Sequence, residues 1–159
     1  MSLFSVNLLL ALVWTALTDS FDAWGFVSGY LIGLGALWVT QPLYGPSGTY
    51  FVRTLRIAQL AGYFVYDLVV SSLRLSWDVV TLRDLSCPKI LAMPLEAESD
   101  LELLITTNLI SLAPGSLTLD ISPDRKTLYV HAMFAEDPDA VIAGLKSGME
   151  RYVRRVFTE

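Results

Sequence analysis

The sequence predicts a membrane protein with an amino-terminal transmembrane helical hairpin, an amphipathic third helix and a small α+β domain. Hydrophobic residues make up 53% of the 159 positions and charged residues only 17%, against about 25% charged in an average soluble domain. Residues 1–86 carry four arginines and five aspartates, whereas residues 87–159 carry seven basic and eleven acidic side chains. These observations divide the chain into segments 1–53, 54–86 and 87–159.

The hairpin is predicted from two stretches without charge, residues 1–18 and 23–52, which are separated by a polar turn at 19–22. At 1.5 Å per residue the first stretch spans about 27 Å as a helix, close to the roughly 30 Å of bilayer hydrocarbon. The second helix is expected to end at Thr40, before Pro42. A cleaved signal peptide is the alternative for the first stretch, but a basic start and an A-x-A site are both missing.

A packing face is predicted on the second helix, where Gly25, Gly29 and Gly33 recur every fourth residue. Small residues at this spacing let another helix approach closely. The first helix offers a matching stripe that includes Asn7 and Ala11, and the Asn7 amide would need a hydrogen-bond partner within lipid. The partner of the glycine face is either the first helix or another subunit.

The orientation is predicted from the basic residues. The turn at 19–22 contains no lysine or arginine, and the first basic residues follow the second helix, at Arg53, Arg56, Arg74, Arg83 and Lys89. Because short cytoplasmic loops are enriched in lysine and arginine, both termini are expected in the cytoplasm.

Residues 54–83 are predicted to form an amphipathic helix. Polar residues recur every three or four positions and form one stripe that is expected to face water. The helix is expected to lie in the inner membrane interface; a third span with the stripe against protein is the alternative. Asp67 suggests a proton relay, but a solvated or arginine-paired carboxylate is the preferred interpretation because no chain of ionisable groups accompanies it.

Residues 87–159 are predicted to form a β-α-β-β-α unit. Strands are expected at 89–95, 117–122 and 128–133, the last two joined by a turn at 122–125. Ser99 and Glu102 form a capping box for a helix that ends at Pro114, and Asp137 caps a last helix. The helix that begins after Ser99 is expected to face the core with Leu101, Leu104, Ile105, Asn108, Leu109 and Leu112. A unit of this size is expected to be stabilised by contacts with the membrane helix or with a partner.

Catalytic chemistry is not predicted. The chain has one histidine, His131, and one cysteine, Cys87, without the spacings that hold metals. The acidic residues between 96 and 102 are interpreted as a solvated helix start. Nothing resembles a basic nucleic-acid-binding block, so an enzyme, a bound cofactor, a metal site and a nucleic-acid partner are not expected.

Two segments carry a family resemblance: NLISLAPGSLTLDIS at 108–122 and TLYVHA at 127–132. They resemble the signature of the E-type subunits of Mrp-type (Mnh or Pha) multisubunit cation/proton antiporters, and the similarity extends over nearly the whole chain. The residues that carry it are Asn108, Pro114, Gly115, Thr118, Asp120, Tyr129 and His131.

The resemblance implies a multi-pass protein of the bacterial inner membrane in a complex that exchanges sodium or potassium for protons and serves pH homeostasis. Its partners would be the large complex I-like antiporter subunits, small membrane subunits and the lipid bilayer. Its role would be accessory and non-catalytic, in assembly and activity. A membrane-anchored regulatory module that binds a cytosolic ligand or protein is the alternative.

Overall fold

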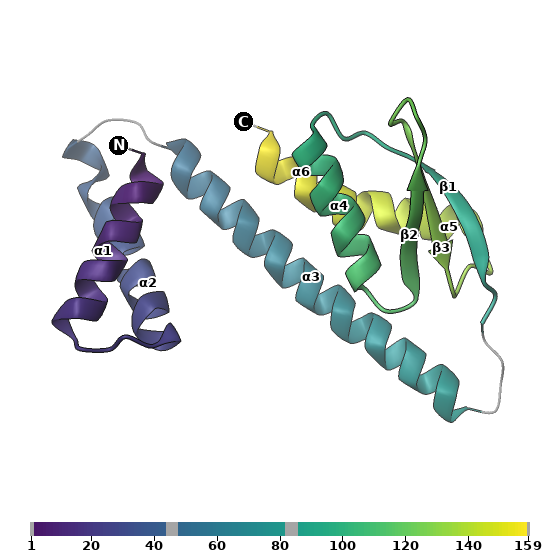
Figure 1. Cartoon of the computed structure of the whole chain (residues 1–159), viewed down its shortest axis with the longest axis horizontal. Coiled ribbons are helices and arrows are strands. Elements are labelled where there is room, and N and C mark those ends of the chain that lie inside the picture. Colours follow the sequence, from purple (N-terminus) through teal and green to yellow (C-terminus); the bar gives the residue numbers. More distant parts are fainter. Residues whose placement is uncertain (1, 44–47, 82–85, 159) are drawn as a thin grey trace. The chain divides into compact units, whose positions relative to one another are not determined.

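The structure is a computed structural model that describes residues 2–43, 48–81 and 86–158 (Figure 1). Arg83, one of the arginines used to predict the orientation, lies outside this part. The chain divides into two compact units, Met1–Thr54 and Leu55–Glu159.

The first unit is a helical hairpin. Helix α1 (Leu3–Leu17) and helix α2 (Ala23–Thr40) are joined by a turn in which Asp19 has a positive φ of 51°. The Asp22 carboxylate caps α2 by accepting a hydrogen bond of 2.6 Å from the backbone N–H of Gly25. A short 3₁₀ turn (η1, Gln41–Leu43) follows α2, as expected where proline interrupts the helical hydrogen bonds.

Helix α3 (Gly48–Val80) continues from the first unit into the second, to which its residues from Leu55 onward belong. The polar positions Tyr63, Asp67 and Ser71 are half-buried, on the side that packs against the rest of the second unit. The expectation of a stripe facing water is wrong in part, because packing against protein half-buries most of its positions, whereas Gln59 and Arg74 are exposed. The outward stripe of α3 is instead apolar and exposed; we define it as Leu55, Val65, Tyr66, Val69, Leu73, Trp77 and Val80.

The second unit contains an antiparallel sheet in the order β1-β3-β2, formed by β1 (Lys89–Pro94), β2 (Ser116–Ile121) and β3 (Thr127–Ala132). Helix α4 (Asp100–Leu112) packs against β2. Alternate strand residues point into the core, which contains Met93, Ile110, Leu128, Val130 and Met149. The order of strands and helices matches the predicted β-α-β-β-α arrangement.

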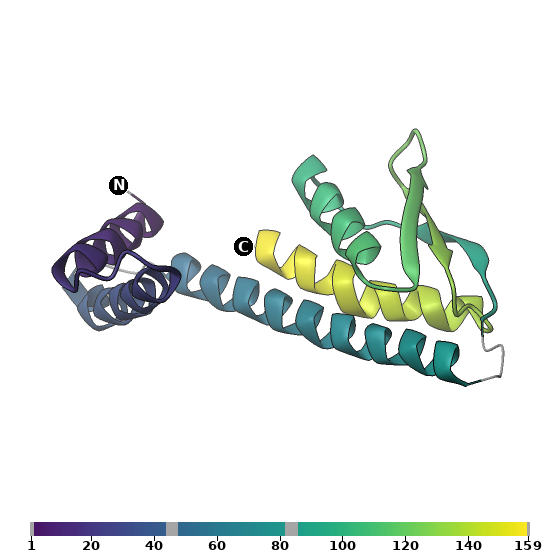
Figure 2. The same cartoon turned by 60° about the horizontal axis from the view of Figure 1, so that its bottom comes forward.

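The last helix is interrupted, which the sequence did not predict. It comprises α5 (Pro138–Leu145), a π-helical segment η2 (Lys146–Glu150) and α6 (Arg151–Phe157). Figure 2 shows α3 running beside this helix. The π-helical segment contains Gly148, where a Cβ atom would lie 2.8 Å from Cζ of Tyr63 on α3. The glycine therefore provides the space into which the tyrosine of α3 fits.

The expected core face of α4 is wrong in part. Leu101, Leu104 and Leu112 are 54–62% exposed, and Asn108 on the same face is also exposed. The buried positions are Glu102, Thr106 and Ile110. Both sides of this helix carry apolar residues, so the periodicity alone could not decide which side faces the sheet.

Candidate functional site

The interface between α1 and α2 uses the small residues that the sequence singled out. Asn7 and Ala11 on α1 are buried, as are Gly25, Gly29 and Gly33 on α2. A Cβ atom at position 29 would lie 2.9 Å from the carbonyl oxygen of Ala11, closer than any side chain tolerates. The glycine face is therefore occupied by α1.

A polar cluster links the hairpin to the first turn of α3. The Asn7 side-chain amide donates a hydrogen bond of 2.9 Å to the Tyr50 hydroxyl, which lies 3.2 Å from the Tyr30 hydroxyl. Asn7 is fully buried, and a hydrogen bond formed away from water is worth more than one at the surface. These contacts join all three helices of the first unit through polar groups.

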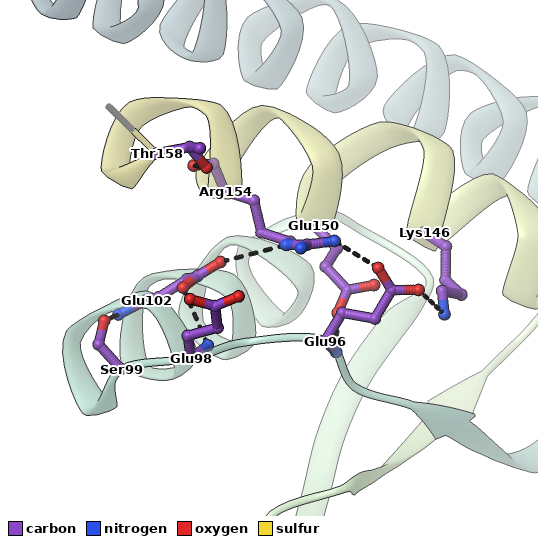
Figure 3. A network of polar contacts seen from close by, with 8 residues as sticks. All are labelled: Glu96, Glu98, Ser99, Glu102, Lys146, Glu150, Arg154 and Thr158. Carbon is purple, nitrogen blue, oxygen red and sulfur yellow. Dashed lines mark hydrogen bonds and ion pairs between the residues drawn. The ribbon is translucent and has the colours of Figure 1, made fainter.

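A network of acidic and basic side chains joins the last helix to the segment between β1 and α4 (Figure 3). The Glu96 carboxylate pairs with Arg154 and, at 2.7 Å, with Lys146. The buried Glu102 carboxylate accepts a hydrogen bond of 3.1 Å from the Glu98 backbone N–H and lies 3.7 Å from Nε of Arg154. The interpretation of residues 96–102 as a solvated acidic helix start is wrong for Glu102, which is buried, whereas Glu96, Glu98 and Asp100 are exposed.

Glu150 is the second buried carboxylate of this network. Its side chain is 2% exposed, and Oε1 accepts a hydrogen bond of 2.6 Å from the Glu96 backbone N–H. Burial raises the pKa of Glu150, while the hydrogen bond from Glu96 and the charges of Lys146 and Arg154 oppose the rise. The paired bases Lys146 and Arg154 hold the pKa of Glu96 below its ordinary value.

Apolar side chains remain uncovered on three surfaces of the second unit. The first is the outward stripe of α3, and the second is the exposed face of α4, which we define as Leu101, Leu104, Asn108 and Leu112. The third is the open face of the sheet, where Ile90 and Leu117 lie opposite His131 on the middle strand. Soluble monomers seldom leave contiguous apolar surface of this extent, which typically marks contacts with protein or membrane.

A metal-binding grouping is absent from the described residues, where no three His, Cys, Asp or Glu side chains come together as a possible metal site. Asp67 is half-buried on the inner side of α3, and the charge that acts on it is that of Arg74 on the same helix. His131 lies on β3, and Cys87 forms an isolated β-bridge with Phe134. Neither joins Asp67 in a grouping of the described residues that could hold a metal ion.

A family profile described as Na⁺/H⁺ ion antiporter subunit matches residues 7–156. The chain belongs to this family. The E1-type Na⁺/H⁺ antiporter subunit from Staphylococcus epidermidis is 31% identical over 153 residues, and the match covers 96% of each chain. The E-type Na⁺/H⁺ antiporter subunit from Bacillus subtilis is 30% identical over 151 residues, and the match covers 95% of each chain.

Solved structures show the same relationship. A chain of the Mrp complex from Dietzia sp. DQ12-45-1b is 27% identical, with a TM-score of 0.51 over 67% of this chain and 99% of that one. A chain of the archaeal membrane-bound sulfane sulfur reductase shares the fold at 20% identity, with a TM-score of 0.58 over 98% of both chains. Membership of the Na⁺/H⁺ ion antiporter subunit family implies a membrane location.

The family resemblance rests partly on residues that join α4 to β2. Pro114 and Gly115 form the turn between them, and Gly115 has a φ of 90°, a conformation that glycine adopts readily. The Thr118 hydroxyl donates a hydrogen bond of 3.1 Å to the carbonyl oxygen of Thr107 on α4. These motif residues fix the helix against the strand.

The other motif residues are at the surface. Asp120 is exposed beside a register irregularity in β2, and its carboxylate accepts a hydrogen bond of 2.8 Å from the N–H of Ile121. Tyr129 and the half-buried His131 alternate on the open face of the sheet. Asn108 donates its amide to the Leu104 carbonyl, 2.7 Å away, on the exposed face of α4. In this antiporter-subunit chain the motif therefore also marks two of the three uncovered surfaces.

Membrane-spanning potential is concentrated in the first unit of this antiporter protein. Of the described residues, Ala23–Leu43 is the one helical stretch long and apolar enough to cross a bilayer, with a mean hydropathy of 1.4. Helix α1 is apolar but shorter, at 15 residues, which is about 22 Å of helix.

Proposed function

We propose that the chain is an accessory, non-catalytic subunit of a monovalent cation/proton antiporter complex in the bacterial inner membrane. Helices α1 and α2 would cross the bilayer as a hairpin, and the second unit would lie on the cytoplasmic side with both termini. There it would contact other subunits and support the assembly and activity of the complex. Sodium or potassium would be the exchanged cation.

The observation that carries this proposal is the set of uncovered apolar surfaces of the second unit, found together with no grouping of side chains in the described residues that could hold a metal ion. A subunit that conducts ions would need a series of ionisable groups inside the membrane. The described residues of α1 and α2 contain no charged side chain. The glycine face is occupied by α1, so contacts with other subunits are assigned to the remaining surfaces.

The similarity to solved complexes supports an assembly role. The Dietzia chain belongs to an Mrp complex, and the relatives from Staphylococcus and Bacillus are named antiporter subunits. The open sheet face and the exposed face of α4 carry the residues of the family motif, and their apolar character suits contacts with protein. We therefore assign contacts with neighbouring subunits to these two surfaces.

The test introduces a charge on each surface and follows co-purification of the other antiporter subunits in mild detergent. Ile90 on the sheet is 65% exposed and Leu104 on α4 is 57% exposed, so Ile90→Lys and Leu104→Lys are expected to leave the fold intact. Each is expected to reduce recovery of the other subunits severalfold, because an unpaired charge buried in an interface is costly. Ala143→Lys, at an exposed position of α5, is the matched control.

The result that overturns the proposal is full co-purification and full cation-driven transport in both surface variants. Loss of assembly in all three variants, including Ala143→Lys, would show that added charge acts through folding, and would also count against the assigned surfaces. Thermal unfolding of each variant in detergent separates these cases, because surface substitutions away from core and caps usually change stability by less than about 0.5 kcal/mol.

A further inference from the structure

A groove lies between α3 and α6 in the second unit. It has a volume of about 310 Å³ and is lined by Gln59, Gly62, Tyr63, Tyr66, Tyr152 and Arg155. No atom would lie within 4 Å of a Cβ at Gly62, so the missing side chain keeps one wall of the groove open. None of the residues assigned to subunit contacts above belongs to it.

Arg155 lines this groove, and Arg151 lies one turn before it on α6, beside Tyr152. The guanidinium carbons of Arg151 and Arg155 are 5.5 Å and 5.9 Å from the centre of the Tyr152 ring. Both side chains are exposed, and neither forms an ion pair with a carboxylate in the part of the chain that the structure describes. Arg154 of the same helix, by contrast, pairs with Glu96. One positive charge therefore lies in the groove and a second lies beside it, and an anion could neutralise both.

The groove opens beside the outward stripe of α3. Tyr66 lines the groove and belongs to the stripe, where it is 63% exposed. One and two turns further along the helix the stripe continues with Val69 and Leu73, which are exposed and apolar. The inner wall is formed by Tyr63, whose ring stacks on Tyr152 at 4.6 Å. A cationic groove with tyrosine walls thus continues directly into an apolar surface.

A cationic groove next to an apolar surface is suited to bind an amphipathic anion. Guanidinium groups bind phosphate oxygens strongly, tyrosine rings favour the headgroup level of a membrane, and basic pockets bind the headgroups of anionic lipids. A free phosphate would use the arginines but leave the stripe uncovered. We propose that this groove binds the phosphate headgroup of an anionic phospholipid, whose acyl chains lie along the outward stripe of α3. The proposal rests on the membrane-anchored position of the second unit given above.

The test measures lipid binding to the full-length chain in detergent by native mass spectrometry, with phosphatidylglycerol, phosphatidylcholine and inorganic phosphate as probes. Phosphatidylglycerol is expected to bind in preference to phosphatidylcholine. The double variant R151Q/R155Q is expected to weaken phosphatidylglycerol binding by about thirtyfold, from roughly fivefold per arginine near an anionic surface. Arg125→Gln is the matched control, because Arg125 is also exposed but pairs with Asp100 on another surface.

A second variant tests the shape of the groove without changing its charge. Gly62→Phe places a ring in open space on α3, so the chain is expected to fold while phosphatidylglycerol binding falls to the level of the double variant. If Gly62→Phe, R151Q/R155Q and Arg125→Gln all bind phosphatidylglycerol as the unchanged chain does, the proposal is overturned. Equal binding of phosphatidylcholine, or displacement of the lipid by inorganic phosphate at equal concentration, also overturns it.

The assembled complex provides the last arm of the test. Retention of phosphatidylglycerol by the purified complex, and its loss from complexes that carry R151Q/R155Q, supports the lipid site. Absence of lipid from the complex overturns it, because another subunit would then cover the groove. Failure of the assembly role would appear differently: the unchanged chain would not co-purify with other subunits. Lipid binding to the isolated chain is measured independently of that result.

Discussion

Substitution of Gly148 by alanine tests the contact between α3 and the last helix. A Cβ atom at this position would overlap the Tyr63 hydroxyl and lie 2.8 Å from Cζ and 3.2 Å from Cε1 of the same ring. The ring cannot turn away freely, because it stacks on Tyr152 at 4.6 Å. Overpacking of this kind typically costs about 1–3 kcal/mol. We expect Gly148→Ala to destabilise the second unit by that amount and to lower its unfolding temperature by at least about 4 °C.

Gly144 supplies a matched control on the same helix, four residues earlier. A Cβ atom there would meet nothing within 4 Å, so Gly144→Ala is expected to stabilise the helix by about 0.5–1 kcal/mol. The two alanines therefore have opposite expected signs. Differential scanning fluorimetry of the full-length chain in detergent gives the unfolding temperatures, and hydrogen exchange of α3 amides around Tyr63 localises the effect. If Gly148→Ala raised stability as Gly144→Ala does, α3 would not pack against the last helix as described.

Three further predictions concern the other contacts. Gly29→Leu is expected to reduce the yield of folded chain from membranes severalfold, because its Cβ would lie 2.9 Å from a backbone carbonyl oxygen of α1. Gly35→Leu is the control: a Cβ at this position meets nothing within 4 Å, so this variant should be recovered normally. The pKa of Glu150 is higher in the folded chain than in the unfolded chain. Between these two pKa values the folded chain therefore binds more protons, and its stability falls as pH rises. Because glutamine does not titrate, Glu150→Gln should gain stability relative to the unchanged chain when denaturation is measured from pH 4 to 8. A stability difference independent of pH would contradict this. Thr118→Val removes the hydroxyl that donates to the Thr107 carbonyl and should cost about 1 kcal/mol in chemical denaturation, so no measurable loss would show that this bond does not hold α4 on β2.

Local sequence signals predicted the two helices of the hairpin and the order of strands and helices along the second unit well. Helix α2 begins at Ala23 and ends at Thr40, as its charge-free stretch and Pro42 indicated, because a proline interrupts the hydrogen bonds of a helix. The strands of the second unit were predicted from alternating apolar residues, which have a short and regular period. In the hairpin the structure also supplies what the periodicity left open: the glycine face packs against α1.

The side on which each helix packs could not be predicted in the same way. In α4 the exposed Leu104 and the buried Ile110 are both apolar, and the polar Thr106 is buried instead. In α3 most of the polar positions face protein, because the tyrosine at position 63 fits against Gly148. Neither contact has a sequence signature, since each depends on a residue more than 80 positions away or on a sheet that forms only in the folded chain. Pairing of Glu96 with the last helix was missed for the same reason.

The polar and apolar contacts of the second unit have different roles. Glu96, Glu102 and Glu150 all bind groups of the same unit, and Glu102 and Glu150 do so while buried. The interior of the unit is otherwise apolar, as in a soluble domain. What distinguishes the unit is its surface, where apolar side chains on α3, α4 and the sheet are exposed. A unit of this size cannot bury all of its apolar surface by itself, so these surfaces are suited to contacts with lipid and protein.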